Sequence, residues 1–107
     1  MIIERIKFHL KFGKAKESIS LWKQMIEELK KDERFQFPVR ILTDVTSSSY
    51  TLIIEMNLRS YTDINPLNYL WSVHAKVREL YQQFIPLCES AERQLYKIEM
   101  EVGPAKR

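Results

Sequence analysis

The sequence predicts an α+β fold of the ferredoxin-like type, with elements in the order β-α-β-β-α-β. Three segments alternate between apolar and polar side chains, as half-buried strands do: residues 2–12, 50–58 and 93–102. One more segment is rich in β-branched residues, and two carry apolar residues at helical spacing: 39–45, 15–31 and 66–89. In the commonest arrangement of this order, both helices cover one face of a four-stranded antiparallel sheet with strand order 4-1-3-2.

The first predicted strand has one apolar and one basic side. Successive side chains of a strand leave opposite faces, so the two sets are Ile6, Phe8, Leu10 and Phe12, and Arg5, Lys7, His9 and Lys11. A strand with so complete an apolar face is expected in the middle of the sheet, beneath the helices. The strand order 4-1-3-2 places it there.

Both predicted helices are amphipathic. In residues 15–31 the charges on the polar side are interleaved in sign, which indicates a solvated face, and the apolar side consists of Ile19, Trp22, Met25, Ile26 and Leu29. In the second helix Pro66 fits the first turn, where a missing N–H has no partner to lose. Pro86 cannot donate to the preceding turn. A kink or break is therefore expected near Phe84, with one further turn through Glu89.

The second face of the sheet is predicted to be polar and uncovered. Residues 39–45 and 50–58 are expected to form a hairpin with a turn at Ser47–Ser49. Lys7 and His9 would then lie between two strands that carry carboxylates, Glu55 on one and Glu99 on the other. Opposite charges on adjacent strands contribute a few tenths to about 1 kcal/mol each. Nothing in the chain remains to cover the apolar residues on this face, which are Ile3, Leu42, Ile53 and Leu95.

Composition predicts a single folded domain over residues 1–107. Hydrophobic residues make up 45% of the chain and charged residues 29%, which is typical of globular proteins and excludes disorder. Cys88 is the one cysteine, so no internal disulfide can form, and we expect it to be a core thiol of the second helix in a reducing compartment. No apolar run approaches the roughly 18 residues of a membrane span. We therefore expect a cytoplasmic protein that does not enter a membrane.

Three stretches resemble one known superfamily. Residues 11–25 (KFGKAKESISLWKQM) resemble its glycine-marked junction into the first helix, residues 51–71 (TLIIEMNLRSYTDINPLNYLW) its acidic strand end and polar lead into the second helix, and residues 84–99 (FIPLCESAERQLYKIE) its proline-bearing helix end and last strand. The chain resembles the dimeric α/β-barrel superfamily, most of all the NIPSNAP-like and antibiotic-biosynthesis-monooxygenase-like members. The resemblance implies that two copies pair their polar sheet faces into a shared barrel with the helices outside, which makes the protein a homodimer.

The resemblance also directs attention to a pocket between the second helix and the sheet. His74 lies one helical turn after Trp71, and Tyr81 and Tyr61 are the other polar aromatic residues available there. His74 is either an acid, base or ligand in this pocket or a half-buried histidine beside a core aromatic residue. Haem-degrading relatives combine a histidine of this helix with a tryptophan and an asparagine. The spacing from Trp71 differs here and the first strand has no asparagine, so no cofactor is expected.

Metal binding and hydroxyl nucleophiles are not favoured. His9, Glu55 and Glu99 would share the polar face and could hold a divalent cation, but no short histidine or cysteine spacing supports a metal site. A polar network at the dimer barrel is the favoured interpretation of these residues. The serines at 47–49 have no nucleophile-elbow motif around them and are assigned to a turn.

Nucleic-acid binding is excluded by the position of the aromatic residues. RNA-recognition modules share this element order and stack bases on aromatic residues of the uncovered face. Here Phe8, Phe12 and Tyr50 are predicted on the helix-covered side, and Glu55 on the open side would repel phosphate.

Two classes of function follow. The first is a dimeric α/β-barrel protein that is non-catalytic or binds a small apolar ligand between the second helix and the sheet. The second is a cofactor-independent monooxygenase or a related small-molecule enzyme, which the resemblance permits. No set of residues forms a recognisable catalytic constellation, so the catalytic residues are unassigned and the binding protein is the favoured interpretation.

Overall fold

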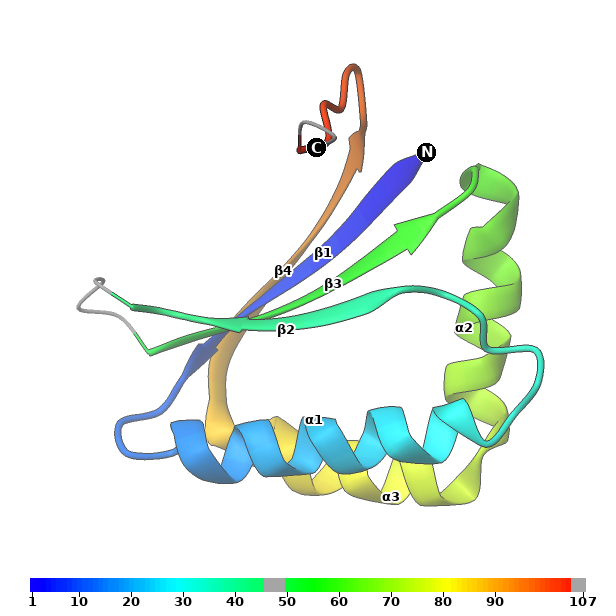
Figure 1. Ribbon diagram of the computed structural model, residues 1–107. Helices are drawn as coiled ribbons and strands as arrows, with labels where there is room; N and C mark the ends of the chain where they lie inside the picture. The colour runs from blue at the N-terminus through cyan, green and yellow to red at the C-terminus, as the bar shows by residue number, and fades with distance from the viewer. Residues whose placement is uncertain (46–49, 105–107) are drawn as a thin grey trace.

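The computed structural model describes residues 1–45 and 50–104. A four-stranded sheet carries helices on one face (Figure 1). In chain order the elements are β1 (Ile2–Leu10), α1 (Ala15–Lys30), β2 (Val39–Thr43), β3 (Thr51–Leu58), α2 (Ile64–Val73), α3 (Ala75–Phe84) and β4 (Cys88–Lys97). Two 3₁₀ turns lie at Tyr61–Asp63 and Ile85–Leu87. The strands are ordered β2-β3-β1-β4. This is the predicted order counted from the other edge, so the ferredoxin-like fold class is confirmed. The turn predicted at Ser47–Ser49 lies outside the described residues.

β1 is a central strand, and its side chains alternate between the face of the sheet that the helices cover and the open face. It runs antiparallel to both neighbours, and Ile6 stands opposite Ile54 of β3 and Arg93 of β4. Phe8 is 3% exposed and faces the helices. Lys7 and His9 alternate with Phe8 and therefore lie on the open face, as predicted. Phe12 lies beyond the end of β1 and is exposed, so its predicted place on the apolar face is wrong.

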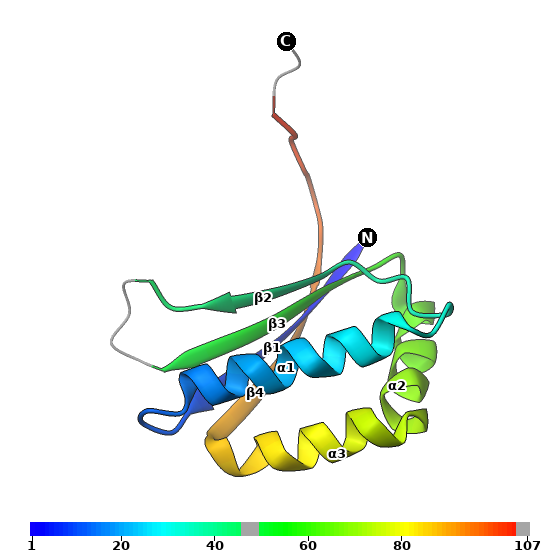
Figure 2. The same ribbon diagram turned by 60° about the horizontal axis from the view of Figure 1, so that its bottom comes forward.

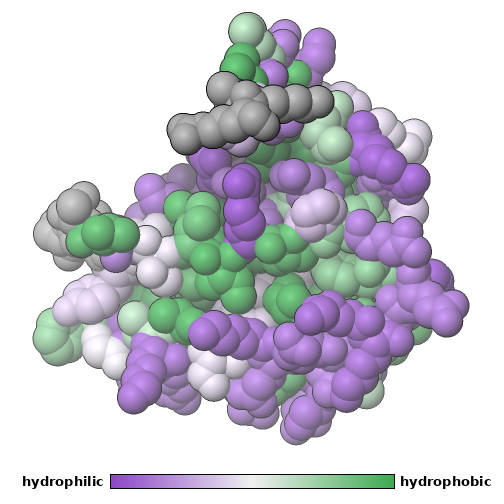
Figure 3. Space-filling view, in the orientation of Figure 1, coloured by the Kyte–Doolittle hydropathy of each residue, from purple (hydrophilic) through white to green (hydrophobic). Residues whose placement is uncertain are grey.

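The core lies between the covered face and the helices. α1 and α3 lie side by side along this face, and α2 stands across their end (Figure 2). Trp22 of α1 packs between Phe8 and Phe84, with ring centroids 5.6 and 5.5 Å away. Around edge strand β2, hydrophobic side chains remain visible at the surface (Figure 3), and Val39 and Ile41 of this strand pack partly buried against the core.

The second helix is divided at His74, a break that the sequence did not predict, and it ends at Phe84, where the predicted break is confirmed. His74 has an extended backbone with φ −91° and ψ 112°, and α3 begins at the next residue. The break changes the direction of the chain (Figure 1), so that buried Leu70 of α2 and buried Val77 of α3 face the same core from different sides. After Phe84 one further turn forms, a 3₁₀ turn over Ile85–Leu87 that contains Pro86. It ends before the predicted Glu89 because β4 begins at Cys88.

β4 begins five residues earlier than predicted and ends five residues earlier. An antiparallel partner is present only as far as β1 extends, and the last backbone bond of this ladder runs from Ile98 N to Met1 O at 3.1 Å. Two predictions are corrected by this register: Leu95 stands opposite Glu4 on the covered face, and Glu99 lies beyond the strand. Tyr96 stands on the open face. Cys88 is the first residue of β4 and half-buried, so its assignment to the second helix is wrong as well.

Candidate ligand-binding cavity

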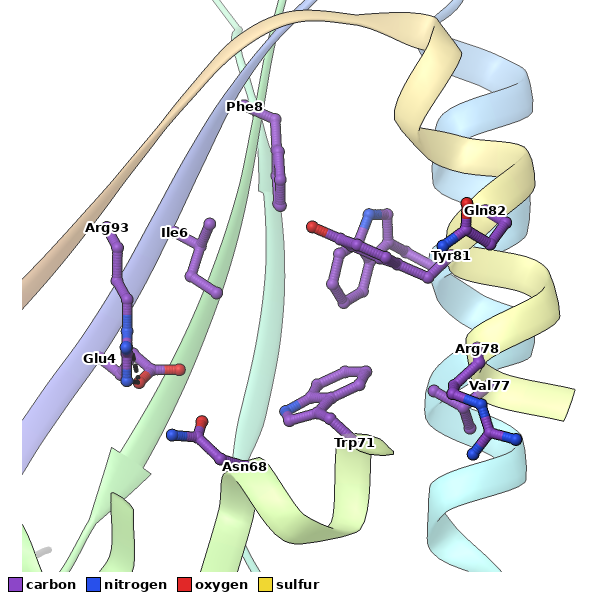
Figure 4. Close-up of a pocket in the computed structure, with 11 residues that line it drawn as sticks. Glu4, Ile6, Phe8, Asn68, Trp71, Val77, Arg78, Tyr81, Gln82 and Arg93 are labelled. Carbon is purple, nitrogen blue, oxygen red and sulfur yellow. Dashed lines mark hydrogen bonds and ion pairs between the residues drawn. The ribbon is translucent and has the colours of Figure 1, made fainter. Parts of the chain in front are cut away.

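A cavity of about 320 Å³ lies between the covered face of the sheet and the three helices. Strands β1 and β4 form its floor, and α2 and α3 form most of its wall (Figure 4). Its lining residues include Ile6, Phe8, Trp22, Trp71, Val77 and Tyr81 on the apolar side and Glu4, Asn68, Arg78, Gln82 and Arg93 on the polar side.

Trp22 joins the aromatic residues of this cavity to the core. Its ring centroid lies 5.5 Å from that of Trp71 and 6.2 Å from that of Tyr81, both in edge-to-face arrangements that suit aromatic quadrupoles. Trp22 is 2% exposed. Within the described residues, its indole Nε1 is the one enclosed polar side-chain atom that has no hydrogen-bond partner. An unpaired buried donor is unfavourable, so this indole is a point where the packing is incomplete.

Glu4 and Arg93 form the polar end of the cavity. Arg93 donates from Nε and Nη2 to the same carboxylate oxygen, Oε2 of Glu4, over 3.1 and 2.6 Å. Glu4 is 3% exposed, although it is a charged residue on the covered face. Figure 4 shows Asn68 of α2 on the same side of the cavity as this pair, with Trp71 and Tyr81 facing them. The cavity therefore combines an aromatic wall with a small, charge-paired polar end.

Tyr81 contributes a hydroxyl group to the aromatic wall. Burial raises the pKa of this phenol, and the nearby Cys88 thiol raises it further. The phenol is therefore protonated at neutral pH and can donate a hydrogen bond. It is a neutral group, and the charges around the cavity are those of Glu4, Arg78 and Arg93.

The four residues predicted to bind a ligand are divided between two places. Trp71 and Tyr81 line the cavity, whereas Tyr61 lies exposed in the 3₁₀ turn before α2 and does not line it. His74 also lies outside the cavity. Its Nε2 is 2.8 Å from Oδ2 of Asp32, in the connection that follows α1.

The environment of His74 is a hydrogen-bond contact with the carboxylate of Asp32. Hydrogen bonds from Arg34, with a smaller contribution from His74, hold the pKa of Asp32 well below its usual value. His74 itself is about one-third exposed. The contact links the break between α2 and α3 to the connection after α1. His74 therefore has a structural role at this position. The interpretation of His74 as an acid or base in the pocket has no support in this geometry.

Glu55 is the centre of a polar network on the open face of the sheet. Glu55 is 3% exposed and receives hydrogen bonds from Arg5, over 2.8 and 3.0 Å, and from Arg40. Lys7 stands opposite Glu92 of β4, which takes the place predicted for Glu99. Among the described residues, no cluster of three or more histidine, cysteine or acidic side chains is arranged to hold a metal ion. No helix in the described ranges is long and apolar enough to cross a membrane.

Comparison with known proteins gives a match in three dimensions only. No protein-family model matches the sequence, and no curated protein matches it. In contrast, an uncharacterised NIPSNAP domain protein from Burkholderia xenovorans superposes with a TM-score of 0.78 at 11% identity, covering 98% of this chain and 100% of the other. A NIPSNAP family protein from Agrobacterium tumefaciens also gives 0.78, at 13% identity and 98% coverage of both chains. A cofactor-independent oxygenase from Streptomyces nogalater gives 0.67, at 13% identity, covering 96% of this chain and 97% of the other.

This chain has the fold of the NIPSNAP and antibiotic-biosynthesis-monooxygenase-like proteins. The predicted resemblance is thereby confirmed for the fold. At these identities the likeness carries no assignment of activity.

Sequence reasoning missed Glu4, Arg93 and Asn68 as members of the site. One signal was present: Glu4 occupies an even position of β1, in a series that otherwise reads Ile2, Ile6, Phe8 and Leu10. A single carboxylate on an apolar face needs a partner or a purpose. Arg93 could not be recognised as that partner, because the predicted register of the last strand was wrong.

Proposed function

We propose that this protein binds a small apolar molecule with an aromatic ring in the cavity between the sheet and helices α2 and α3. The observation that carries the proposal is the cavity itself, beside Trp71 and Tyr81. Its volume of about 320 Å³ lies at the lower end of the range for small-molecule sites, roughly 300–1,000 Å³. Such sites combine apolar and aromatic walls with a few polar groups, which is the composition of this cavity.

Indole and its isostere benzofuran are suitable probes of this proposal. Both are planar and bicyclic, and they differ only in an N–H group or an oxygen atom in the five-membered ring. Titration of the full chain, followed by calorimetry and by the indole N–H signals of the two tryptophans, is expected to show saturable binding. Trp71→Ala is expected to weaken both ligands about tenfold or more, because it removes one side of the cavity.

Tyr69→Ala is the matched control for Trp71→Ala. Tyr69 is an aromatic residue of the same helix, is 53% exposed and does not line the cavity. This variant should bind both probes as the wild type does. Absence of binding at millimolar concentrations, or equal binding by the wild type and Trp71→Ala, would refute the proposal.

A homodimer formed through the open face of the sheet is the second part of the proposal. Leu42 and Tyr96 lie on this face and are 37% and 43% exposed, and no helix of the described chain covers them. A second copy would bury them against the same face of its own sheet. Light scattering at micromolar concentration is expected to give twice the chain mass. Leu42→Asp should give the monomer mass, and Ile85→Asp, at an exposed position outside the sheet, should remain dimeric. A monomeric wild type would refute this assembly.

A cofactor-independent oxygenase is the second candidate function. The likeness to the Streptomyces nogalater oxygenase favours it, and the cavity would hold an electron-rich aromatic substrate beside the protonated Tyr81. Oxygen consumption with a hydroquinone, in protein free of added metal and cofactor, distinguishes the two functions. Turnover that Tyr81→Phe abolishes would establish the enzyme. Binding without turnover would favour the first function, a ligand-binding protein. The half-buried thiol of Cys88 suits either function in a reducing cytoplasm.

A further inference from the structure

Stability does not explain the presence of Glu4 on the covered face. Its side chain is 4% exposed, so the carboxylate has lost nearly all of its contact with bulk water. A buried ion pair offsets this loss only when its geometry is good, and well-packed apolar residues often serve at least as well. The neighbours of Glu4 on the same face of β1 are Ile2 and Ile6, and a leucine would continue that pattern.

Among the described residues, Glu4 has hydrogen-bond donors at one of its two carboxylate oxygens. Arg93 donates twice to Oε2, and Oε1 accepts no hydrogen bond from the described residues. Figure 4 shows the second oxygen of Glu4 directed into the cavity. Glu55, the buried carboxylate of the open face, is the internal comparison: Arg5 binds its Oε2 and Arg40 binds its Oε1. Glu55 therefore has both oxygens occupied, in contrast to Glu4.

The charges around the cavity restrict what Oε1 can bind. Glu4 is the one acidic residue of the lining, and Arg78 and Arg93 are the two basic ones, so the described lining carries a net charge of +1. A cation would be repelled by this balance, and an acidic ligand would be repelled by Oε1 at close range. A neutral N–H or O–H group satisfies Oε1 without either cost. Trp71 and Tyr81, which face Glu4 across the cavity, supply an apolar surface for the ring that bears this group.

We propose that Glu4 is a ligand-binding residue whose free carboxylate oxygen accepts a hydrogen bond from an N–H or O–H group on a neutral aromatic ligand in the cavity. This inference rests on the proposed function, because it names the chemical class of the ligand. Arg93 holds Oε2 and so leaves Oε1 turned toward the ligand.

The preference for indole over benzofuran tests this inference separately from binding itself. The wild-type chain is expected to bind indole about tenfold tighter, since only indole donates to Oε1 and hydrogen bonds to charged groups are among the stronger ones. In Glu4→Leu the preference should disappear while benzofuran still binds. Arg93 is 46% exposed and can extend into water in this variant, so the chain keeps its fold.

Asp63→Asn is the control for removal of a buried carboxylate. Asp63 is 6% exposed, is held by Arg59 and lies outside the cavity lining, so this variant should keep the tenfold preference. Equal binding of indole and benzofuran by the wild type, or an unchanged preference in Glu4→Leu, would overturn the inference and leave the proposed function intact. Failure of the wild type to bind either probe would overturn both.

Discussion

Truncation of Trp71 tests whether this residue is a wall of a cavity or part of the packed core. Phe84 is the reference, since it is fully buried and contacts the rings of Phe8, Trp22 and Tyr81 at centroid distances of 4.8, 5.5 and 6.1 Å. A Phe→Ala change in a core costs about 3–5 kcal/mol in total, and a residue with three aromatic partners lies at the upper end of that range. We therefore expect Phe84→Ala to lose about 4–5 kcal/mol of unfolding free energy.

Trp71→Ala should cost far less, although tryptophan is the larger residue. Trp71 is half-buried, one of its sides faces the cavity, and Trp22 is its one ring partner among the described residues. We expect a loss of about 1–2 kcal/mol, made up of one aromatic pair and partial burial. With a urea m value of about 2 kcal/mol/M, the midpoint shifts by about 0.5–1 M for Trp71→Ala and by about 2 M or more for Phe84→Ala.

Urea unfolding followed by circular dichroism measures both values. In Trp71→Ala the remaining tryptophan is Trp22, whose fluorescence reports exposure of the core in the same experiment. Phe84→Leu retains most of the volume and should recover over half of the loss seen in Phe84→Ala. A loss for Trp71→Ala as large as that for Phe84→Ala would show that Trp71 is packed on all sides, and the cavity would not be available to a ligand.

Three further outcomes follow from single residues. The pKa of Asp32 is lowered in the folded state, so its ionised carboxylate stabilises the fold above the pKa of the unfolded chain, and this stability is lost as the pH falls through the pKa of the folded state. Asp32→Asn should therefore be less stable than the wild type at about pH 7. The urea midpoints of the two proteins should converge as the pH falls below about 4. Burial raises the pKa of Cys88 to about 11, so iodoacetamide should modify it roughly a hundredfold more slowly at about pH 8 than an unperturbed thiol, and a rate equal to that of free cysteine would contradict this burial. Gly13 has φ +75° and open space where a Cβ atom would stand, so Gly13→Ala should lose about 1 kcal/mol from backbone strain alone, and an unchanged urea midpoint would contradict it.

The sequence predicted the elements whose two faces meet different environments. β1 and β3 alternate clearly because one side meets the helices and the other does not, and their faces were assigned correctly. β4 is an edge strand in which Ala91, Arg93 and Leu95 share the covered face, so alternation there is weak. A clearer alternation follows it, at Ile98 and Met100, but these residues lie beyond Lys97, the last residue of β4.

The division of the second helix has a similar cause. Apolar residues recur at steps of three and four through His74, so the periodicity continues across the break. Pro86 was the visible local signal, and it correctly marks the end of α3 at Phe84 and the 3₁₀ turn that follows. The break at His74 depends on packing of α2 and α3 against the same core, and on the contact with Asp32, which is 42 residues away in the chain. Such long-range contacts leave no local pattern.

The candidate site was predicted only where it depends on one helix face. Trp71 and Tyr81 were named because helical spacing places them beside the apolar stripe, and both line the cavity. Glu4 and Arg93 are 89 residues apart, and their contact depends on the register of β1 with β4. That register is set by pairing with a strand far away in the sequence, and the pattern of β4 alone does not contain it.

Glu4 and Glu55, the two buried carboxylates of the sheet, differ in how many of their oxygens accept hydrogen bonds. This difference separates a binding role from a structural one. Each lies on a central strand and is 3% exposed, so each has given up a similar amount of hydration. Glu55 replaces the lost hydration by hydrogen bonds from two arginines, one to each carboxylate oxygen. These bonds form a complete polar network on the open face. Glu4 has one arginine on one oxygen, beside an aromatic cavity that could hold a further donor. Oε1 of Glu4 accepts no hydrogen bond from the described residues and is open to the cavity, so a neutral donor in that space would be a favourable partner for it.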